Sequence, residues 1–83
     1  MERYNALSKV YITVKAVFYA DGGLEPISFI WEDGHEYKIA RIVDVRRAAS
    51  LKAGGVGIRY TCKVHNQVVY IFFEEDRWFM ERN

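Results

Sequence analysis

The chain has little of what would cross-link a fold or build a metal centre: one cysteine, one proline and two histidines in 83 residues. Because a lone cysteine cannot form an internal disulfide, Cys62 excludes the covalent framework of a small secreted domain. One cysteine and the separated His35 and His65 fall short of the four closely spaced ligands of a structural zinc site. We therefore predict no metal and no cofactor.

Long apolar runs and a strong charge of one sign are missing as well. No apolar stretch approaches the roughly 20 residues of a membrane-spanning helix, and residues 1–9 lack the apolar segment of a signal peptide. The formal net charge is only +1, so composition alone predicts no attraction to nucleic acid or to a membrane. We expect a cytoplasmic domain that has no membrane partner.

Alternating apolar residues dominate what is present. The chain is 51% hydrophobic and 16% aromatic, and its length suits one domain, residues 1–83, with 1–9 as a loose N-terminal arm. From Val10 to Phe18 every second residue is apolar, which is typical of a strand with one buried face. The same alternation continues after turn signals at Gly22-Gly23, Asp33-Gly34 and His65 to Gln67.

The pattern predicts an all-β fold of five to six antiparallel strands in a meander, curled into a small, partly open SH3-like barrel. Pro26 opens the second strand. The third strand runs from Tyr37 to Val45 with a bulge near Ala40 to Ile42, and Arg46 to Gly55 is an irregular stretch. The predicted core comprises Trp31, Tyr37, Ile39, Val43, Ile58, Tyr60, Ile71, Phe73 and Trp78.

Catalytic patterns are weak. Cys62 is predicted to face inward among apolar neighbours, where a thiol is inert. The carboxylates at the turns, Glu32, Asp33 and Glu36 and then Glu74 to Asp76, suit solvated turns better than acid–base chemistry. We predict no catalytic residue and no enzymatic activity, and an enzyme that uses these turn carboxylates is the least supported alternative.

Charge is divided along the chain. Residues 21–36 contain five acids and no lysine or arginine, whereas residues 41–63 contain six basic residues and one acid, Asp44. We expect these charges to pair with opposite charges across the sheet. The alternative is a basic patch interleaved with Tyr60 and Tyr70, which would suit single-stranded nucleic acid. The candidate nucleic-acid-binding residues are Arg46, Arg47, Lys52, Arg59 and Lys63.

The continuous apolar run from Val68 to Phe73 predicts a strand covered on both faces. The second face is covered either within the monomer or by a second copy in a homodimer, and both interpretations are open.

The aromatic and turn residues also have a recurring layout: Pro26, Phe29 and Trp31, the turn Asp33-Gly34, then Tyr37 and Ile39, later Tyr60, and finally Trp78-Phe79. This layout resembles a family of small uncharacterised bacterial all-β domains over residues 12–82. Some members of that family are associated with DNA-repair loci, so the resemblance implies a link to nucleic acid. It implies no catalytic residue.

The sequence therefore predicts a small non-enzymatic β-domain that acts as a protein-interaction or accessory binding module. Single-stranded nucleic-acid binding through the basic residues is the main alternative.

Overall fold

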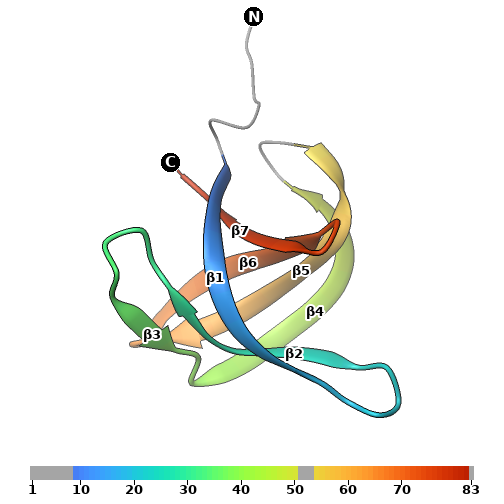
Figure 1. Ribbon diagram of the computed structural model, residues 1–83, viewed down its shortest axis with the longest axis horizontal. Helices are drawn as coiled ribbons and strands as arrows, with labels where there is room; N and C mark the ends of the chain where they lie inside the picture. The colour runs from blue at the N-terminus through green and yellow to red at the C-terminus, as the bar shows by residue number, and fades with distance from the viewer. Residues whose placement is uncertain (1–8, 51–53, 83) are drawn as a thin grey trace, which may run out of the picture.

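A computed structural model describes residues 9–50 and 54–82, which form one antiparallel sheet of seven strands (Figure 1). The strands are β1 (Lys9–Phe18), β2 (Leu24–Ile30), β3 (Glu36–Lys38), β4 (Arg41–Ser50), β5 (Gly54–Val64), β6 (Gln67–Glu74) and β7 (Arg77–Glu81). Their order across the sheet is β3-β2-β1-β7-β6-β5-β4, so the first and last strands are neighbours. The two outer strands, β3 and β4, are consecutive in the sequence and do not pair.

Tight turns join the paired strands, and each has the backbone that its residues favour. Gly22 and Gly34 adopt φ angles of 99° and 89° in three-residue loops, where glycine carries no steric penalty. The β5–β6 and β6–β7 turns have two residues each, His65-Asn66 and Glu75-Asp76, all with positive φ. This is the backbone of a type I′ turn, whose twist matches that of the flanking strands.

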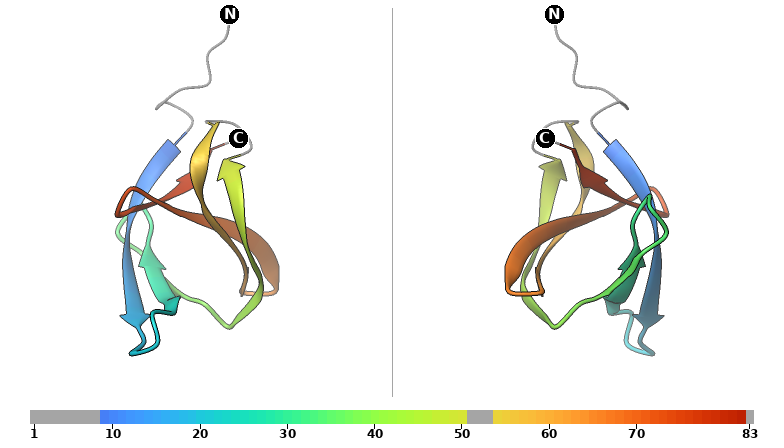
Figure 2. Two further views of the ribbon diagram at one scale, coloured as in Figure 1. Left: turned by 90° about the vertical axis from the view of Figure 1, so that its right-hand side faces the viewer. Right: turned by 90° about the vertical axis from the view of Figure 1, so that its left-hand side faces the viewer.

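The sheet curls into a half-barrel, and β1 joins its two sides because the two halves of this strand pair with different neighbours. Its first part, Lys9 to Ile12, pairs with β7, and its second part, Thr13 to Phe18, pairs with β2. A register shift between Lys15 and Ala16 lies opposite Pro26, at the one place in β2 where a missing N–H disturbs the ladder least. Figure 2 shows β2 and β3 facing β4, β5 and β6 across the interior.

The inner face carries the core, which is built around Phe29, Tyr60, Cys62, Val64 and Ile71. The Tyr60 hydroxyl donates a hydrogen bond of 2.7 Å to the carbonyl of Leu24 and so ties β5 to β2 across the interior. Of the predicted core, Tyr60 and Ile71 are buried, and the remaining members except Val43 pack against them.

A second, smaller cluster lies on the outer face. Phe72 and Phe79 are both 1% exposed, and their rings stack with centroids 5.1 Å apart. The Lys9 ammonium lies 4.6 Å from the centroid of Phe79 and pairs with Glu74 at 2.9 Å. The second half of the Val68 to Phe73 run is therefore covered on both faces within the monomer, as one of the two interpretations predicted.

Two expectations about β4 and β5 are wrong. The predicted third strand is two strands, separated at Ile39 and Ala40, whose N–H groups donate to Ile27 and Lys63 respectively. The stretch from Arg46 to Gly55 is not irregular where it is described: β4 continues to Ser50 and β5 begins at Gly54, and residues 51–53 lie outside the described chain. Backbone hydrogen bonds between strands set these boundaries, and the alternation of side chains in the sequence does not reveal where those bonds begin and end.

Several face assignments are also wrong. Val43, predicted in the core, is 51% exposed because an extra residue between the Ile42 and Asp44 pairs disrupts the ladder there. Ala16 and Phe18 were expected on the buried face of β1, but both are exposed, Phe18 to 73%, and they lie beyond the part of β1 that pairs with β7. Ile27, two residues before the buried Phe29, is exposed because it is the extra residue of β2 at the register shift.

The architecture confirms the expected fold class: an all-β, antiparallel sheet curled into a small, partly open barrel, with seven strands in place of five or six. Within residues 9–50 and 54–82 there is no helix with the length and apolar character needed to cross a lipid bilayer.

Candidate functional site

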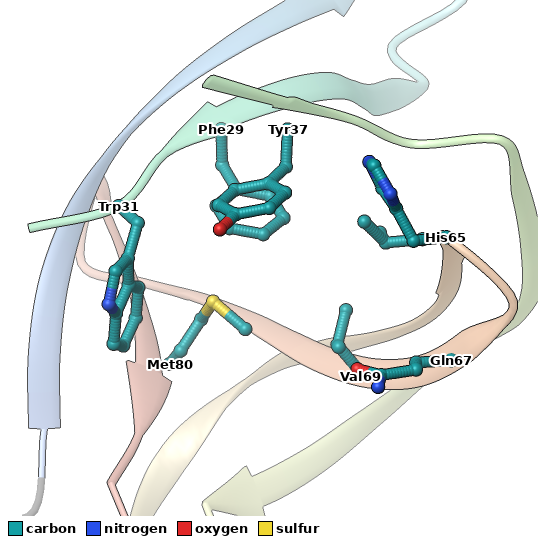
Figure 3. Close-up of a pocket in the computed structure, with 8 residues that line it drawn as sticks. Phe29, Trp31, Tyr37, His65, Gln67, Val69 and Met80 are labelled. Atoms are coloured by element: carbon teal, nitrogen blue, oxygen red, sulfur yellow. The ribbon is translucent and has the colours of Figure 1, made fainter. Parts of the chain in front are cut away.

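A pocket opens at the mouth of the half-barrel, between the β2–β3 hairpin and the β5–β6 turn (Figure 3). We call it the mouth pocket, and its volume is about 230 Å³. It lies between strands that are far apart in the sequence and meet because the sheet curls. Its lining residues are Phe29, Trp31, Tyr37, Val64, His65, Gln67, Val69 and Met80.

Aromatic rings form one wall of the mouth pocket. Phe29 and Tyr37 stack with centroids 5.3 Å apart, and Trp31 stands at one end of the pair in Figure 3. Tyr37 also lies between two histidine rings, 4.5 Å from His35 and 5.8 Å from His65. Because these contacts hold the rings to one another, the wall is formed before any ligand arrives.

The polar groups of the mouth pocket include His65 of the β5–β6 turn and Gln67 at the start of β6, both exposed at the rim, and the Tyr37 hydroxyl, which points into the pocket (Figure 3). Phe29 and Val64, by contrast, are almost fully buried and form part of its floor. An apolar floor with a few polar groups at the rim is the usual composition of a binding pocket.

The five predicted basic residues do not form one patch. On β5, Arg59 and Lys63 lie on the outer face because they alternate with the inward-facing Tyr60 and Cys62. Arg46 lies on the outer face as well, since it is the register partner of Arg59. Arg47 pairs with Ile58 and lies on the inner face. Lys52 lies outside the described residues.

Three of these residues do gather, together with Arg41, which sequence analysis did not select. Arg41 is the register partner of Lys63, and Arg46 is the register partner of Arg59. The expectation that opposite charges pair across the sheet is therefore wrong between β4 and β5. Asp44 is the acid among them, and it accepts hydrogen bonds of 2.8 and 3.5 Å from Arg46 of its own strand.

The two tyrosines expected among the basic residues lie on opposite faces of the sheet. Tyr60 is buried on the inner face and takes no part in the surface. Tyr70 is 43% exposed on the outer face, and the Arg59 guanidinium carbon lies 5.2 Å from its ring centroid. The Arg59 Nε atom is buried, with no hydrogen-bond partner among the described residues.

The carboxylates of the β2–β3 hairpin are held in structural contacts. Glu32 pairs with Arg82 at 3.2 Å, and the Asp33 carboxylate accepts a hydrogen bond from the His35 N–H. Glu36 accepts from the Ser28 hydroxyl at 2.7 Å and pairs with Lys15 at 3.2 Å, and these contacts lower its pKa. A lowered pKa is the opposite of what a general acid requires near neutral pH.

The thiol of Cys62 is fully buried, and burial raises its pKa to about 11, so it is protonated at neutral pH. Among residues 9–50 and 54–82 no group of three or more histidine, cysteine, aspartate or glutamate side chains is placed to hold a metal ion.

The predicted self-association through Val68 to Phe73 has two routes open to it. β5 pairs with β6 from Gln67 to Phe73, whereas β7 pairs only with Phe72 to Glu74, so one edge of the first half of β6 has no strand partner among the described residues. Val68 and Tyr70 are also exposed on the outer face. The homodimer stays a prediction, and it could form through that edge or through that face.

Sequence analysis did not identify the mouth pocket. Phe29, Trp31 and Tyr37 were recognised, but as core and strand residues, and His65 and Gln67 as parts of a turn. Their common location follows from the curl of the sheet, for which the alternating pattern holds no signal. The sequence did predict the two turns that lie on either side of the pocket, at Asp33-Gly34 and at His65 to Gln67. Two such turns at the same end of a barrel are the signal that could have suggested the pocket.

The chain matches no protein-family model, no curated protein and no solved structure. The resemblance to small bacterial β-domains stays a prediction, and the functional argument depends on the geometry alone.

Proposed function

We propose that this protein is a non-enzymatic binding module for a protein partner, and that one bulky apolar side chain of the partner enters the mouth pocket. One observation carries the proposal: the fold's own core leaves a preformed, aromatic-walled pocket open at the surface. Apolar surface that remains open is costly to leave in water, and burying it on binding is favourable.

The size of the pocket selects the kind of ligand. Small-molecule and cofactor sites commonly span about 300–1,000 Å³, whereas the mouth pocket holds about 230 Å³. An apolar cavity of about 150 Å³ admits benzene. The mouth pocket therefore suits the ring of a phenylalanine or tryptophan, or a leucine, that anchors a longer polypeptide.

The neighbouring chemistry favours binding over catalysis. His65 and Gln67 at the rim can donate to or accept from a peptide backbone. The nearest carboxylates are already paired, and Cys62 is a protonated, buried thiol. No nucleophile with an adjacent base lines the pocket.

Phage display of random 12-residue peptides, followed by NMR titration of the enriched peptides, tests the proposal. We expect the enriched peptides to share one bulky apolar residue and to shift the amide signals of Val64, His65 and Val69. Replacing that residue by alanine should weaken binding by at least about tenfold, the value of burying a large apolar side chain.

Two adjacent valines provide a matched pair of variants. Val69 lines the mouth pocket, whereas its neighbour Val68 is exposed on the outer face. Val69→Trp should fill the pocket and abolish peptide binding, and Val68→Trp should leave it unchanged. Equal losses in the two variants, or amide shifts confined to the outer face, would contradict the proposal.

A further inference from the structure

A second surface lies on the opposite side of the same strands and carries a different chemistry. We call it the cationic strip and define it as Arg41 and Arg46 of β4, Arg59 and Lys63 of β5 and Tyr70 of β6. All five side chains lie on the outer face. On β5 the residues Arg59 and Lys63 alternate with inward-facing core residues, and the other three are register partners of outward-facing residues of β5. None of them lines the mouth pocket.

The cationic strip places like charges directly opposite each other. Arg41 faces Lys63, and four residues along β5 Arg46 faces Arg59. Like charges opposite each other on neighbouring strands are destabilising, and a sheet selected for stability alone would alternate their signs. Asp44 relieves one of the four cations, since it pairs with Arg46.

The remaining three cations have no carboxylate partner within the described chain. Arg41 is exposed, Lys63 is half-buried, and Arg59 is held over Tyr70 with its Nε unpartnered. An anion that bridges the two strands would supply the missing counter-charge to both like-charged pairs at once. The strip is thus arranged for a ligand that carries more than one negative charge.

An aromatic ring lies beside the two pairs of cations, on the neighbouring strand β6. Tyr70 pairs in register with Thr61, midway between Arg59 and Lys63 along β5, and Asp44 is the partner of Thr61 on β4. Four strand residues span about 13 Å, so a ligand with a charged group at each end would have its middle level with the tyrosine. The exposed Val68 extends the apolar surface beside the ring.

We infer that the cationic strip binds single-stranded nucleic acid, with backbone phosphates at the two cation pairs and a base on Tyr70. A repeating anionic backbone whose flat rings branch off to the side matches two pairs of cations with a tyrosine beside the gap between them. A sheet that presents an aromatic ring to an unstacked base is an established way to bind a single strand. A duplex keeps its bases stacked, and residues 9–50 and 54–82 supply no helix beside this face that could enter a groove. This site goes beyond the proposed protein-binding function and uses separate residues.

Fluorescence anisotropy with a labelled 20-nucleotide oligothymidylate, its duplex with oligoadenylate and a labelled polyglutamate tests the inference. We expect the single strand to bind most tightly at 25 mM salt. The slope of log affinity against log salt should be about −2 to −3, from three or four phosphate contacts. No binding of the single strand, tighter binding of the duplex, or polyglutamate binding of equal strength would each overturn the inference.

Charge reversal on the two faces of β4 and β5 separates the site from general electrostatics. Arg41→Glu and Lys63→Glu together should weaken oligothymidylate binding by at least about 30-fold, since each loses a phosphate contact and adds repulsion. Arg47→Glu makes the same charge change as Arg41→Glu alone, on the same strand but on the inner face; it should weaken binding by less than about threefold, and Arg41→Glu alone should weaken binding by more. Equal losses from the two faces would show that net charge, and not the strip, holds the ligand.

Two further variants check folding and stacking. Lys63→Glu alone relieves the repulsion from Arg41, so its melting temperature should rise by about 1–5 °C while its binding falls. A loss of binding with a lower melting temperature would mean that the fold was damaged and would contradict the like-charge argument. Tyr70→Ala should weaken binding by roughly 5- to 100-fold, and Tyr70→Phe should retain it. An unchanged affinity in Tyr70→Ala would show that no base stacks on Tyr70 and would contradict that part of the inference.

Discussion

The thiol of Cys62 shows how one buried residue links pH to stability. Its pKa in the folded protein is about 11 instead of 9.0, because burial disfavours the thiolate. An unfolded chain therefore loses this proton at a lower pH than the folded chain does. The contribution of Cys62 to the free energy of unfolding is constant below pH 9, falls as the pH rises to about 11, and is level above that.

We predict that the stability difference between the wild type and Cys62→Ala narrows by up to about 2 kcal/mol between pH 8.5 and 11. Urea unfolding at a series of pH values measures it. Lys9 and Tyr60 also have raised pKa values, from the Glu74 hydrogen bond and from burial respectively. Both groups are present in each protein, so their own titration largely cancels in the comparison, apart from the smaller part of the raised Tyr60 pKa that comes from Cys62. A difference that stays constant across this range would contradict the prediction.

At the scale of single strands, the β6–β7 turn has the less favourable backbone of the two two-residue turns in the described part of the chain. Glu75 and Asp76 have φ angles of 53° and 65°, a region that costs residues with a Cβ about 1–2 kcal/mol. The β5–β6 turn is better suited to the same backbone, because Asn66 tolerates positive φ.

Replacing Glu75-Asp76 by Asn-Gly should raise the free energy of unfolding by about 1 kcal/mol, since this pair is the one preferred in a type I′ turn. Chemical denaturation provides the measurement. Asn66→Gly is the matched control in the other turn and should change stability by less. If the control gains as much as the β6–β7 variant, the strain does not lie where the φ angles place it.

The sequence predicted some elements well, and the reason is physical. Alternation located β1 near Val10 and β5 near Tyr60, because those strands have one face in the core and the other in water. It failed on β4, which is an outer strand with few covered positions, so its two faces differ little in polarity. It also gave no indication that Phe79 would join Phe72 in a cluster on the outer face.

Of the two candidate surfaces, the sequence could supply the residue types but not their grouping. The cations of β4 and β5 were visible as a run of charge, yet only the register shows that Arg41 opposes Lys63. The inner location of Arg47 depends on the extra residue at Val43, a backbone irregularity with no side-chain signature. The mouth pocket depends in turn on the curl of the whole sheet.

The molecule as a whole is a meander whose chain starts in the middle. Consecutive strands pair everywhere except at β3 and β4, and the sheet is completed by β1 beside β7. Lys9 is the register partner of Glu81, so the two terminal strands end side by side. The expected meander is therefore present, but it is circularly permuted.

A permuted chain that begins at Ala40 and ends at Ile39 should retain the fold. An Asn-Gly turn would join Glu81 to Lys9 and make β7 and β1 a hairpin. The Ala40 nitrogen would still donate to Lys63 and the Ile39 N–H to Ile27. We expect faster refolding than in the natural chain, because the β1–β7 contacts become local. Stopped-flow fluorescence of Trp78 and Trp31 measures the rate, and an unchanged or slower rate would contradict the expectation.

One consequence follows from the alternation of side chains along β5. Val64 lines the mouth pocket, and Lys63, the residue before it, belongs to the cationic strip. If both proposed ligands bind, the single sheet lies between an apolar side chain on one face and an anionic strand on the other. Neither ligand would block the other, and the domain would then act as an adaptor that joins a polypeptide to a nucleic-acid strand.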